Sequence, residues 1–136
     1  MKYQTEMDSI QNCPPNAKEQ IDQEAYRLVR EPLNSDSFLP PGIMKPSRAE
    51  AETREERKCS FYALSLFTTE RNAEKHYNKL KGKYKNIENT IGSNIAVGRV
   101  EQHDGYATKP TRSGHFDFFE NTSCDLAKKF NIIKSL

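Results

Sequence analysis

The sequence lacks the short motifs by which many enzymes are identified. Its glycines are scattered and form neither the G-x-G-x-x-G motif of dinucleotide-binding folds nor a P-loop. No serine stands in the G-x-S-x-G turn of α/β-hydrolases. The three histidines are far apart, and none has a second histidine at the spacing of a zinc site. We therefore expect no metal site, and no motif identifies a reaction.

Long hydrophobic stretches and paired cysteines are also missing. No apolar run approaches the roughly 18 residues of a membrane-spanning helix, and the start of the chain lacks the apolar segment of a signal peptide. Cys13, Cys59 and Cys124 are odd in number and far apart, which argues against a disulfide framework. We expect a protein of the reducing cytoplasm without a membrane partner.

The composition suits one small domain. The chain has 136 residues with seven Phe and six Tyr but no Trp, which is enough aromatic material for one core. Its hydrophobic fraction of 35% is low, so part of the chain is expected to lie outside that core. Residues 1–15 are polar and are predicted to form a flexible tail. Residues 16–136 are predicted to form one domain, with a proline-rich loop and an exposed helix at 31–57.

Hydrophobic periodicity predicts the elements of this domain. The best helix follows a capping Thr68 or Thr69, because Ala73, Tyr77, Leu80 and Tyr84 recur at helical spacing. Gly82 weakens its last turn, so the helix should end close to that residue. Shorter helices are predicted at 17–23, at 47–57 after an S-x-x-E capping box, and at 125–132. Strands are predicted at 24–30 (a continued helix being the alternative), 59–67, 94–101, 106–109 and 115–119.

These elements predict the fold class. Asp104-Gly105 supplies a tight turn, which predicts a hairpin between 94–101 and 106–109. Strands followed by one strongly amphipathic helix predict an α+β fold, with a small mixed, mostly antiparallel sheet and one principal helix packed on it.

The principal helix is expected to carry a basic surface. Residues 70–85 include six basic and two acidic residues, a net charge of +4. Arg71, Lys75, Lys79 and Lys83 follow one another at i,i+4 and could contact phosphates of a nucleic acid. A solvated lysine-rich surface that binds nothing is the alternative interpretation.

His115 and Asp117 are the best candidates for proton transfer. They are two residues apart in a predicted strand and therefore share one face of it. Histidine is the commonest general base, and a neighbouring carboxylate can orient it. The polar face of an edge strand is the alternative interpretation.

Six short motifs occur in an order that resembles a group of small uncharacterised bacterial proteins. They are YRLV at 26–29, DSFLP at 36–40, SLF at 65–67, IAVG at 95–98, DG at 104–105 and GHF at 114–116. The resemblance spans most of residues 25–132. It implies a fold-sized unit and a bacterial setting, and it implies no activity.

A second similarity is to ADP-ribosyltransferase-like domains, which include small bacterial toxins. Those domains place an Arg or His on a first strand, a Ser, Thr or Tyr on a middle strand and a Glu late in the sheet. Arg27, Ser65 and Glu101 or Glu120 stand in these places. The resemblance implies that Arg27 holds the pyrophosphate of NAD, that Ser65 orients the nicotinamide ribose and that the glutamate stabilises an oxocarbenium ion. The chain lacks the E-x-E or Q-x-E pair and the S-T-S motif of that family.

The leading functional prediction is a small binding or regulatory module that docks onto a protein partner. The predicted helix at 47–57 has no apolar face, and the loop before it is long and proline-rich. Segments of this kind are often ordered by a partner. The alternatives are an enzyme that acts on a nucleotide cofactor and a nucleic-acid-binding protein that uses the basic helix.

Overall fold

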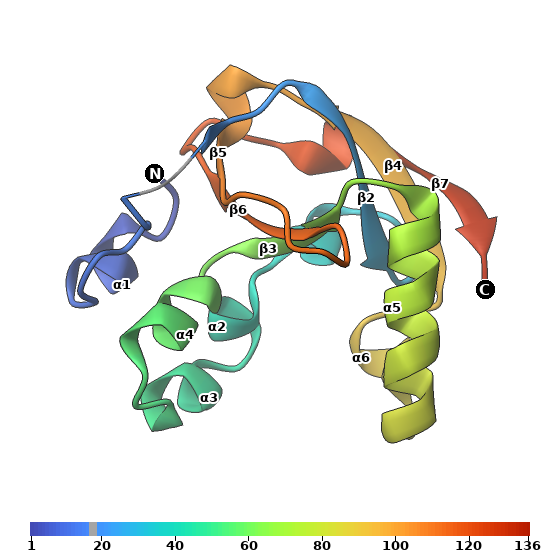
Figure 1. Cartoon of the computed structure of the whole chain (residues 1–136), viewed down its shortest axis with the longest axis horizontal. Coiled ribbons are helices and arrows are strands. Elements are labelled where there is room, and N and C mark those ends of the chain that lie inside the picture. The colour runs from blue at the N-terminus through green and yellow to red at the C-terminus, as the bar shows by residue number, and fades with distance from the viewer. Residues whose placement is uncertain (17–18) are drawn as a thin grey trace.

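A computed structural model describes residues 1–16 and 19–136 as an antiparallel sheet with helices around it (Figure 1). The strand order is β1-β5-β6-β3-β2-β4-β7, and all six neighbouring pairs are antiparallel. The predicted α+β fold with a mostly antiparallel sheet is confirmed. The strands are β1 (Glu19–Gln20), β2 (Gln23–Val29), β3 (Leu64–Phe67), β4 (Asn94–Val100), β5 (Gly105–Ala107), β6 (His115–Glu120) and β7 (Phe130–Ser135).

The principal helix, α5 (Glu70–Lys83), packs on one face of the sheet. The Thr69 side chain caps it by accepting a hydrogen bond from the Asn72 amide. Ala73 and Tyr77 are buried, as the helical spacing predicted. Tyr84 was predicted to share this apolar side, which is wrong, because the helix ends at Lys83 and Tyr84 is 59% exposed.

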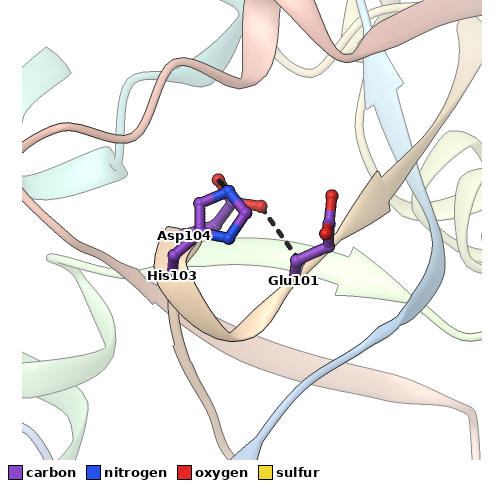
Figure 2. A group of neighbouring side chains, drawn as sticks. All are labelled: Glu101, His103 and Asp104. Carbon is purple, nitrogen blue, oxygen red and sulfur yellow. Dashed lines mark hydrogen bonds and ion pairs between the residues drawn. The ribbon is translucent and has the colours of Figure 1, made fainter.

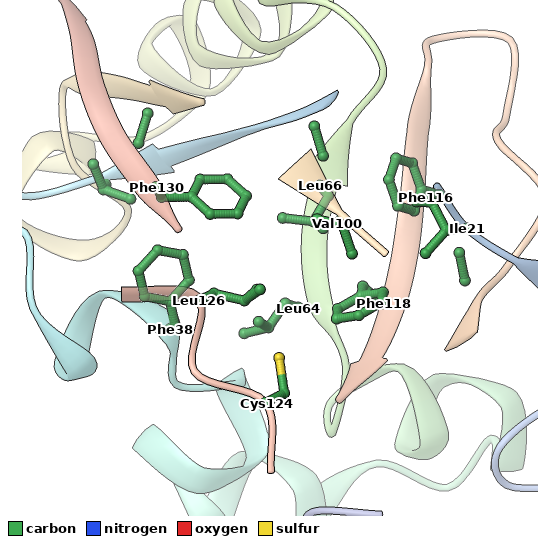
Figure 3. Close-up of a cluster of buried hydrophobic side chains, with 14 residues drawn as sticks. Ile21, Phe38, Leu64, Leu66, Val100, Phe116, Phe118, Cys124, Leu126 and Phe130 are labelled. Carbon is green, nitrogen blue, oxygen red and sulfur yellow. The ribbon is translucent and has the colours of Figure 1, made fainter. Parts of the chain in front are cut away.

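The larger hydrophobic core covers the opposite face of the sheet (Figure 3). Phe116 and Phe118 of β6 point into it, which confirms the predicted alternation of that strand. Further core residues come from segments outside the sheet, with Phe38 from η1 (Ser35–Phe38) and Leu126 from η3 (Leu126–Lys128). The sheet therefore has an α5 face and a core face, and both are covered.

The N-terminal segment is not the predicted flexible tail. It forms α1 (Gln4–Asp8), and Met7 is 1% exposed where it packs against Phe119 and Ala63. Cys13 forms a disulfide with Cys59, which corrects the prediction that the cysteines stay unpaired. Tyr3, Met7 and Ile10 do recur at helical spacing, but the stretch around them is polar and too short for this to predict a packed helix. The cysteines are 46 residues apart, and no spacing rule pairs them.

The segment after β2 is also more ordered than predicted. It contains α2 (Pro41–Met44), α3 (Pro46–Ala51) and α4 (Glu55–Ser60) instead of one long exposed helix. The backbone is extended at Glu52, which separates α3 from α4, and no capping box forms because Pro46 already begins α3. Ala49 and Cys59 are buried, so these helices do have an apolar side.

Four further element predictions are corrected. Residues 59 and 60 belong to α4, so the strand predicted at 59–67 begins only at Leu64. The predicted hairpin is wrong, because β5 pairs with β6 and β1 while β4 pairs with β2 and β7. The helix predicted at 125–132 is a single turn followed by β7. Of the helix predicted at 17–23, residues 17–18 lie outside the described residues, and Glu19–Gln20 and Gln23 are in strands.

The sheet opens between β2 and β3. Along β2 every residue from Gln23 to Val29 has a partner in β4, but only Tyr26 is in register with a β3 residue, Phe67. The two central strands therefore separate beyond this pair. Close packing supports the end of β2. Gly92, with φ 101°, lies so near Val29 that an added Cβ would meet the Val29 oxygen at 2.1 Å.

Among the described residues, no helix combines the length and apolar character needed to cross a membrane.

Candidate functional site

A cavity of about 420 Å³ lies where β2 and β3 separate. Its walls are the end of β2 with the loop that follows, β3, the η1–α2 segment, and residues of α5 and α6 (Ile87–Thr90). In Figure 1, α2 lies on one side of this region and the α5–α6 pair on the other. The volume falls in the range of pockets that hold small molecules. Residues of both faces of the sheet line it, since Val29 belongs to the core face and Phe67 to the α5 face.

Arg27 is the central polar side chain of this cavity. Its Nε donates to the main-chain oxygen of Ser37 at 2.8 Å, and its Nη1 donates to the main-chain oxygen of Ser65 at 3.0 Å. These two bonds fix the guanidinium across the opening between the strands. Burial lowers the pKa of Arg27 to about 10, with the charge of Glu120 acting in the opposite direction. The side chain is therefore still a cation at neutral pH.

This cation forms no close ion pair within the described parts of the chain, and Glu120 acts on it only from a greater distance. No carboxylate lies within 4.0 Å of Arg27 there, and Nη2 makes no hydrogen bond to those residues. Glu31 and Asp36 also line the cavity, but both are exposed. Arg30 stands at the rim, where Nη1 donates to the oxygen of Asn89 at 3.0 Å.

His76 closes the α5 side of the cavity. Its ring centroid lies 5.1 Å from that of Phe67 and 6.5 Å from that of His115. Burial lowers the pKa of His76, and the nearby His115 and Lys79 lower it further. The imidazole beside the cavity is therefore neutral at pH 7.

The structure brings Ser65, His115 and Asp117 together on the α5 face. Ser65 Oγ is 3.0 Å from His115 Nε2, and Asp117 Oδ1 is 3.8 Å from the same nitrogen. Asp117 Oδ2 accepts a hydrogen bond from Ser60 Oγ at 2.7 Å, and burial raises the pKa of Asp117. The predicted shared face of His115 and Asp117 is confirmed. In a catalytic triad the carboxylate holds the other ring nitrogen. Here both groups approach Nε2, so His115 does not bridge them.

The residues matched to the ADP-ribosyltransferase pattern do not converge. Ser65 Oγ lies on the α5 face with His115, whereas Glu120 shares the opposite face with Phe118 and is paired with Lys2 Nζ at 2.9 Å. Glu101 is five residues along β4 from Ala96, the partner of Arg27. That is about 17 Å along the strand. The Ser65 hydroxyl and the two glutamates therefore do not meet at one point beside Arg27, and the predicted nucleotide-dependent activity stays a prediction.

Glu101 belongs instead to a group that resembles a metal site. Potential ligand atoms of Glu101, His103 and Asp104 all lie within 4.8 Å of one another (Figure 2). The Lys129 ammonium already lies 3.0 Å from Glu101 Oε1 and 2.5 Å from Asp104 Oδ2. A protein cation therefore occupies the position that a metal ion would take.

The basic residues of α5 form the second candidate surface. Arg71, Lys75, Lys79 and Lys83, hereafter the α5 stripe, are all exposed. None of the four makes an ion pair with a described residue. At 1.5 Å rise per residue, successive charges are about 6 Å apart along the helix.

The cavity itself was not predicted from the sequence. The sequence points to Arg27 but not to Arg30 or His76, because each of these two residues is unremarkable within its own element. Their convergence depends on the separation of β2 from β3, for which the sequence offered no signal.

Comparison with models of protein families, with curated proteins and with solved structures found no match. The resemblance to small bacterial proteins therefore stays a prediction.

Proposed function

We propose that the protein binds a small anionic ligand with an apolar body in the cavity between β2 and β3. One observation carries the proposal: Arg27 is half-buried and fixed by two main-chain oxygens, yet no described carboxylate pairs with it. Charged side chains that leave water are normally paired, because removing a charge from water is expensive. A ligand anion would supply the missing partner.

The lining of the cavity supports a ligand of mixed character. Carboxylate and phosphate groups accept hydrogen bonds from arginine through two oxygens at once. The apolar lining, including Leu39, Met44, Phe67 and Ile91, offers contact to a hydrophobic or ring-shaped body. NAD, which the ADP-ribosyltransferase resemblance assigns to Arg27, is one compound with this chemistry. The proposal concerns binding and names no reaction.

Calorimetric titration with NAD, ADP, inorganic pyrophosphate and a medium-chain carboxylate tests this proposal. We expect one of these compounds to bind, and Arg27→Gln to weaken it by roughly 10- to 100-fold, the loss for a hydrogen bond to a charged group. Phosphate-containing compounds and the carboxylate are titrated separately. The compound that binds therefore also identifies which anionic group the cavity prefers. Arg99→Gln is the matched control, since Arg99 is exposed and pairs with Asp22 at the far end of β4. Equal binding by both variants, or binding of none of the four compounds, would overturn the proposal.

A protein partner that docks onto the molecule is the alternative function. The exposed helix and long loop predicted at 31–57 no longer argue for it. The segment at 31–57 forms part of the cavity wall and has buried residues of its own, among them Phe38 and Ala49. It does not need a partner to be ordered. Docking would therefore have to use the exposed side of α2 and α3, where Met44 is 45% exposed.

We also infer that the protein works in an oxidising compartment and not in the cytoplasm predicted from the sequence. The Cys13–Cys59 disulfide supports this inference, because such bonds seldom persist in a reducing cytoplasm. Protein taken from its host and unfolded in the presence of an alkylating agent should carry one alkylated cysteine, Cys124. Three alkylated cysteines would contradict the inference.

A further inference from the structure

The α5 stripe occupies the flank of the helix that is not used for packing against the rest of the chain. Ala73 and Tyr77 face the sheet, and Glu74 on another flank pairs with Lys134 of β7 at 3.0 Å. The four basic side chains lie on the remaining flank of α5. His76 lies between this flank and the side that carries Ala73 and Tyr77. The four basic residues form a line of charge about 18 Å long, the rise of 12 helical residues, that makes no ion pair with the residues the structure describes.

A further exposed basic residue lies near the start of the stripe, and an exposed aromatic residue follows its end. At its start, Arg112 is exposed in the turn before β6, and this turn packs on α5. A Cβ at Gly114 would lie 2.0 Å from Asn72 Nδ2. At its end, Tyr84 follows the last helical turn and is 59% exposed, as are few other large hydrophobic residues in the described part of the chain. At the end of α5 the last cation of the stripe, Lys83, is thus followed directly in the chain by an exposed aromatic residue.

We propose that this surface binds single-stranded nucleic acid. Cations spaced regularly along a line can follow the phosphates of an extended strand, and an exposed tyrosine can stack on an unpaired base. The bases of a duplex are already stacked on one another, so a duplex has no unpaired base on which Tyr84 could stack. A membrane surface would require apolar residues beside the charges, but the apolar side of α5 is already buried against the sheet. The proposal is independent of the ligand in the cavity.

Fluorescence anisotropy with labelled dT12, a 12-base-pair duplex and vesicles containing phosphatidylserine tests the proposal. We expect dT12 to bind more tightly than the duplex or the vesicles. With four phosphate contacts, the logarithm of the affinity should fall with the logarithm of salt concentration with a slope of about −3. Absence of dT12 binding at 50 mM salt would overturn the proposal, as would tighter binding to the duplex or the vesicles.

Two charge-reversal variants distinguish an effect of the α5 stripe on dT12 affinity from an effect of the protein's net charge. Lys75→Glu/Lys79→Glu and Lys45→Glu/Lys128→Glu both lower the net charge by four, and all four lysines are exposed. We expect the first variant to lose at least tenfold in dT12 affinity and the second to stay within about twofold at 150 mM salt. Equal losses would show a general charge effect and would overturn the assignment to α5.

Tyr84→Ala tests the stacking contact. We expect a loss of about 5- to 100-fold at an unchanged salt slope, because stacking does not release counterions. Unchanged affinity would remove Tyr84 from the proposed surface and with it the preference for single strands. Arg27→Gln should bind dT12 as the wild type does, so that a failure of the cavity proposal and a failure of this one remain distinguishable.

Discussion

Arg27 Nη1 donates to the main-chain oxygen of Ser65 across 3.0 Å at the point where β2 and β3 stop pairing. A side chain thus provides the hydrogen bond that a neighbouring strand would supply in a continuous sheet. The same guanidinium brings a positive charge to the cavity that this separation creates. The end of the sheet and the proposed binding site therefore depend on one residue, which makes Arg27 the first target for substitution.

Replacing Arg27 with methionine should change stability little. The variant leaves the oxygens of Ser37 and Ser65 without their donor, which costs about 1–3 kcal/mol. It also removes a half-buried charge that forms no close ion pair with the described residues, and such replacements are often neutral or stabilising. We expect the free energy of unfolding in urea to stay within about 1 kcal/mol of the wild type. A loss above about 3 kcal/mol would show that Arg27 is mainly structural, and ligand binding would then need a different probe.

Asp117 should make stability depend on pH. Burial raises its folded pKa above the 3.8 of a free aspartate, so the folded protein holds this proton more tightly than the unfolded chain does. The stabilisation is complete below about pH 3.8 and is lost as pH rises through the folded pKa. We expect Asp117→Asn to gain stability relative to the wild type as pH rises from 4 to 7. Parallel stability curves for the two proteins would contradict this assignment.

The elements predicted correctly are those whose own pattern determines them. Helix α5 has several apolar residues at helical spacing, and Phe116 and Phe118 alternate with polar residues in β6. Strand β7 was mistaken for a helix because Leu126, Phe130 and Ile133 have helical spacing, although the first belongs to a separate turn. Pairing was harder to predict than element type. The chain does turn at Asp104-Gly105, but the strand that follows, β5, pairs with β6 and not with β4.

The candidate site shows the same limit. His115 and Asp117 could be predicted to share a face because they are two residues apart in one strand. Arg27 and His76 come from β2 and α5, and only the packing of helix on sheet brings both to one cavity. The disulfide depends on α1 and α4 meeting beside Phe119. Contacts of this kind depend on tertiary structure, which no periodicity in one chain encodes.

Removal of the disulfide should destabilise the protein substantially. Cys13 and Cys59 close a loop of 46 residues in sequence separation, and the chain-entropy model gives about 4 kcal/mol for a loop of this size. We expect Cys13→Ser/Cys59→Ser to lose roughly this amount in urea denaturation. The wild type should lose the same amount when a reductant is added, while the double variant should not respond to it. If the stability of the wild type did not change on addition of reductant, the Cys13–Cys59 disulfide would be contradicted.

Cys124 should be an unreactive thiol in the folded protein. It is buried, and burial together with the charges of Glu120 and Asp104 raises its pKa to about 12. The nucleophilic thiolate is therefore scarce at pH 8. We expect iodoacetamide to modify Cys124 only after denaturation, as followed by mass spectrometry. Rapid modification of the native protein would show that the segment around Cys124 opens readily.

Lys129 should be the residue that keeps metal ions out of the group formed by Glu101, His103 and Asp104. Its ammonium bridges both carboxylates, and the Asp104 side chain is only 5% exposed. Lys129→Met keeps most of the apolar stem but leaves two like charges together. We expect a loss of about 2–4 kcal/mol, because one of the uncompensated charges is buried.

A divalent cation should reverse part of that loss. Two carboxylates and an imidazole within 4.8 Å of one another suit Mn²⁺, which accepts oxygen and nitrogen ligands. In thermal denaturation, millimolar Mn²⁺ should therefore raise the Tm of Lys129→Met. It should raise that of the wild type far less, because there the ion would have to displace the lysine. Adding His103→Ala to the variant should reduce the Mn²⁺ effect if the imidazole is a ligand. An equal response of wild type and Lys129→Met would mean that Lys129 does not occupy the cation position.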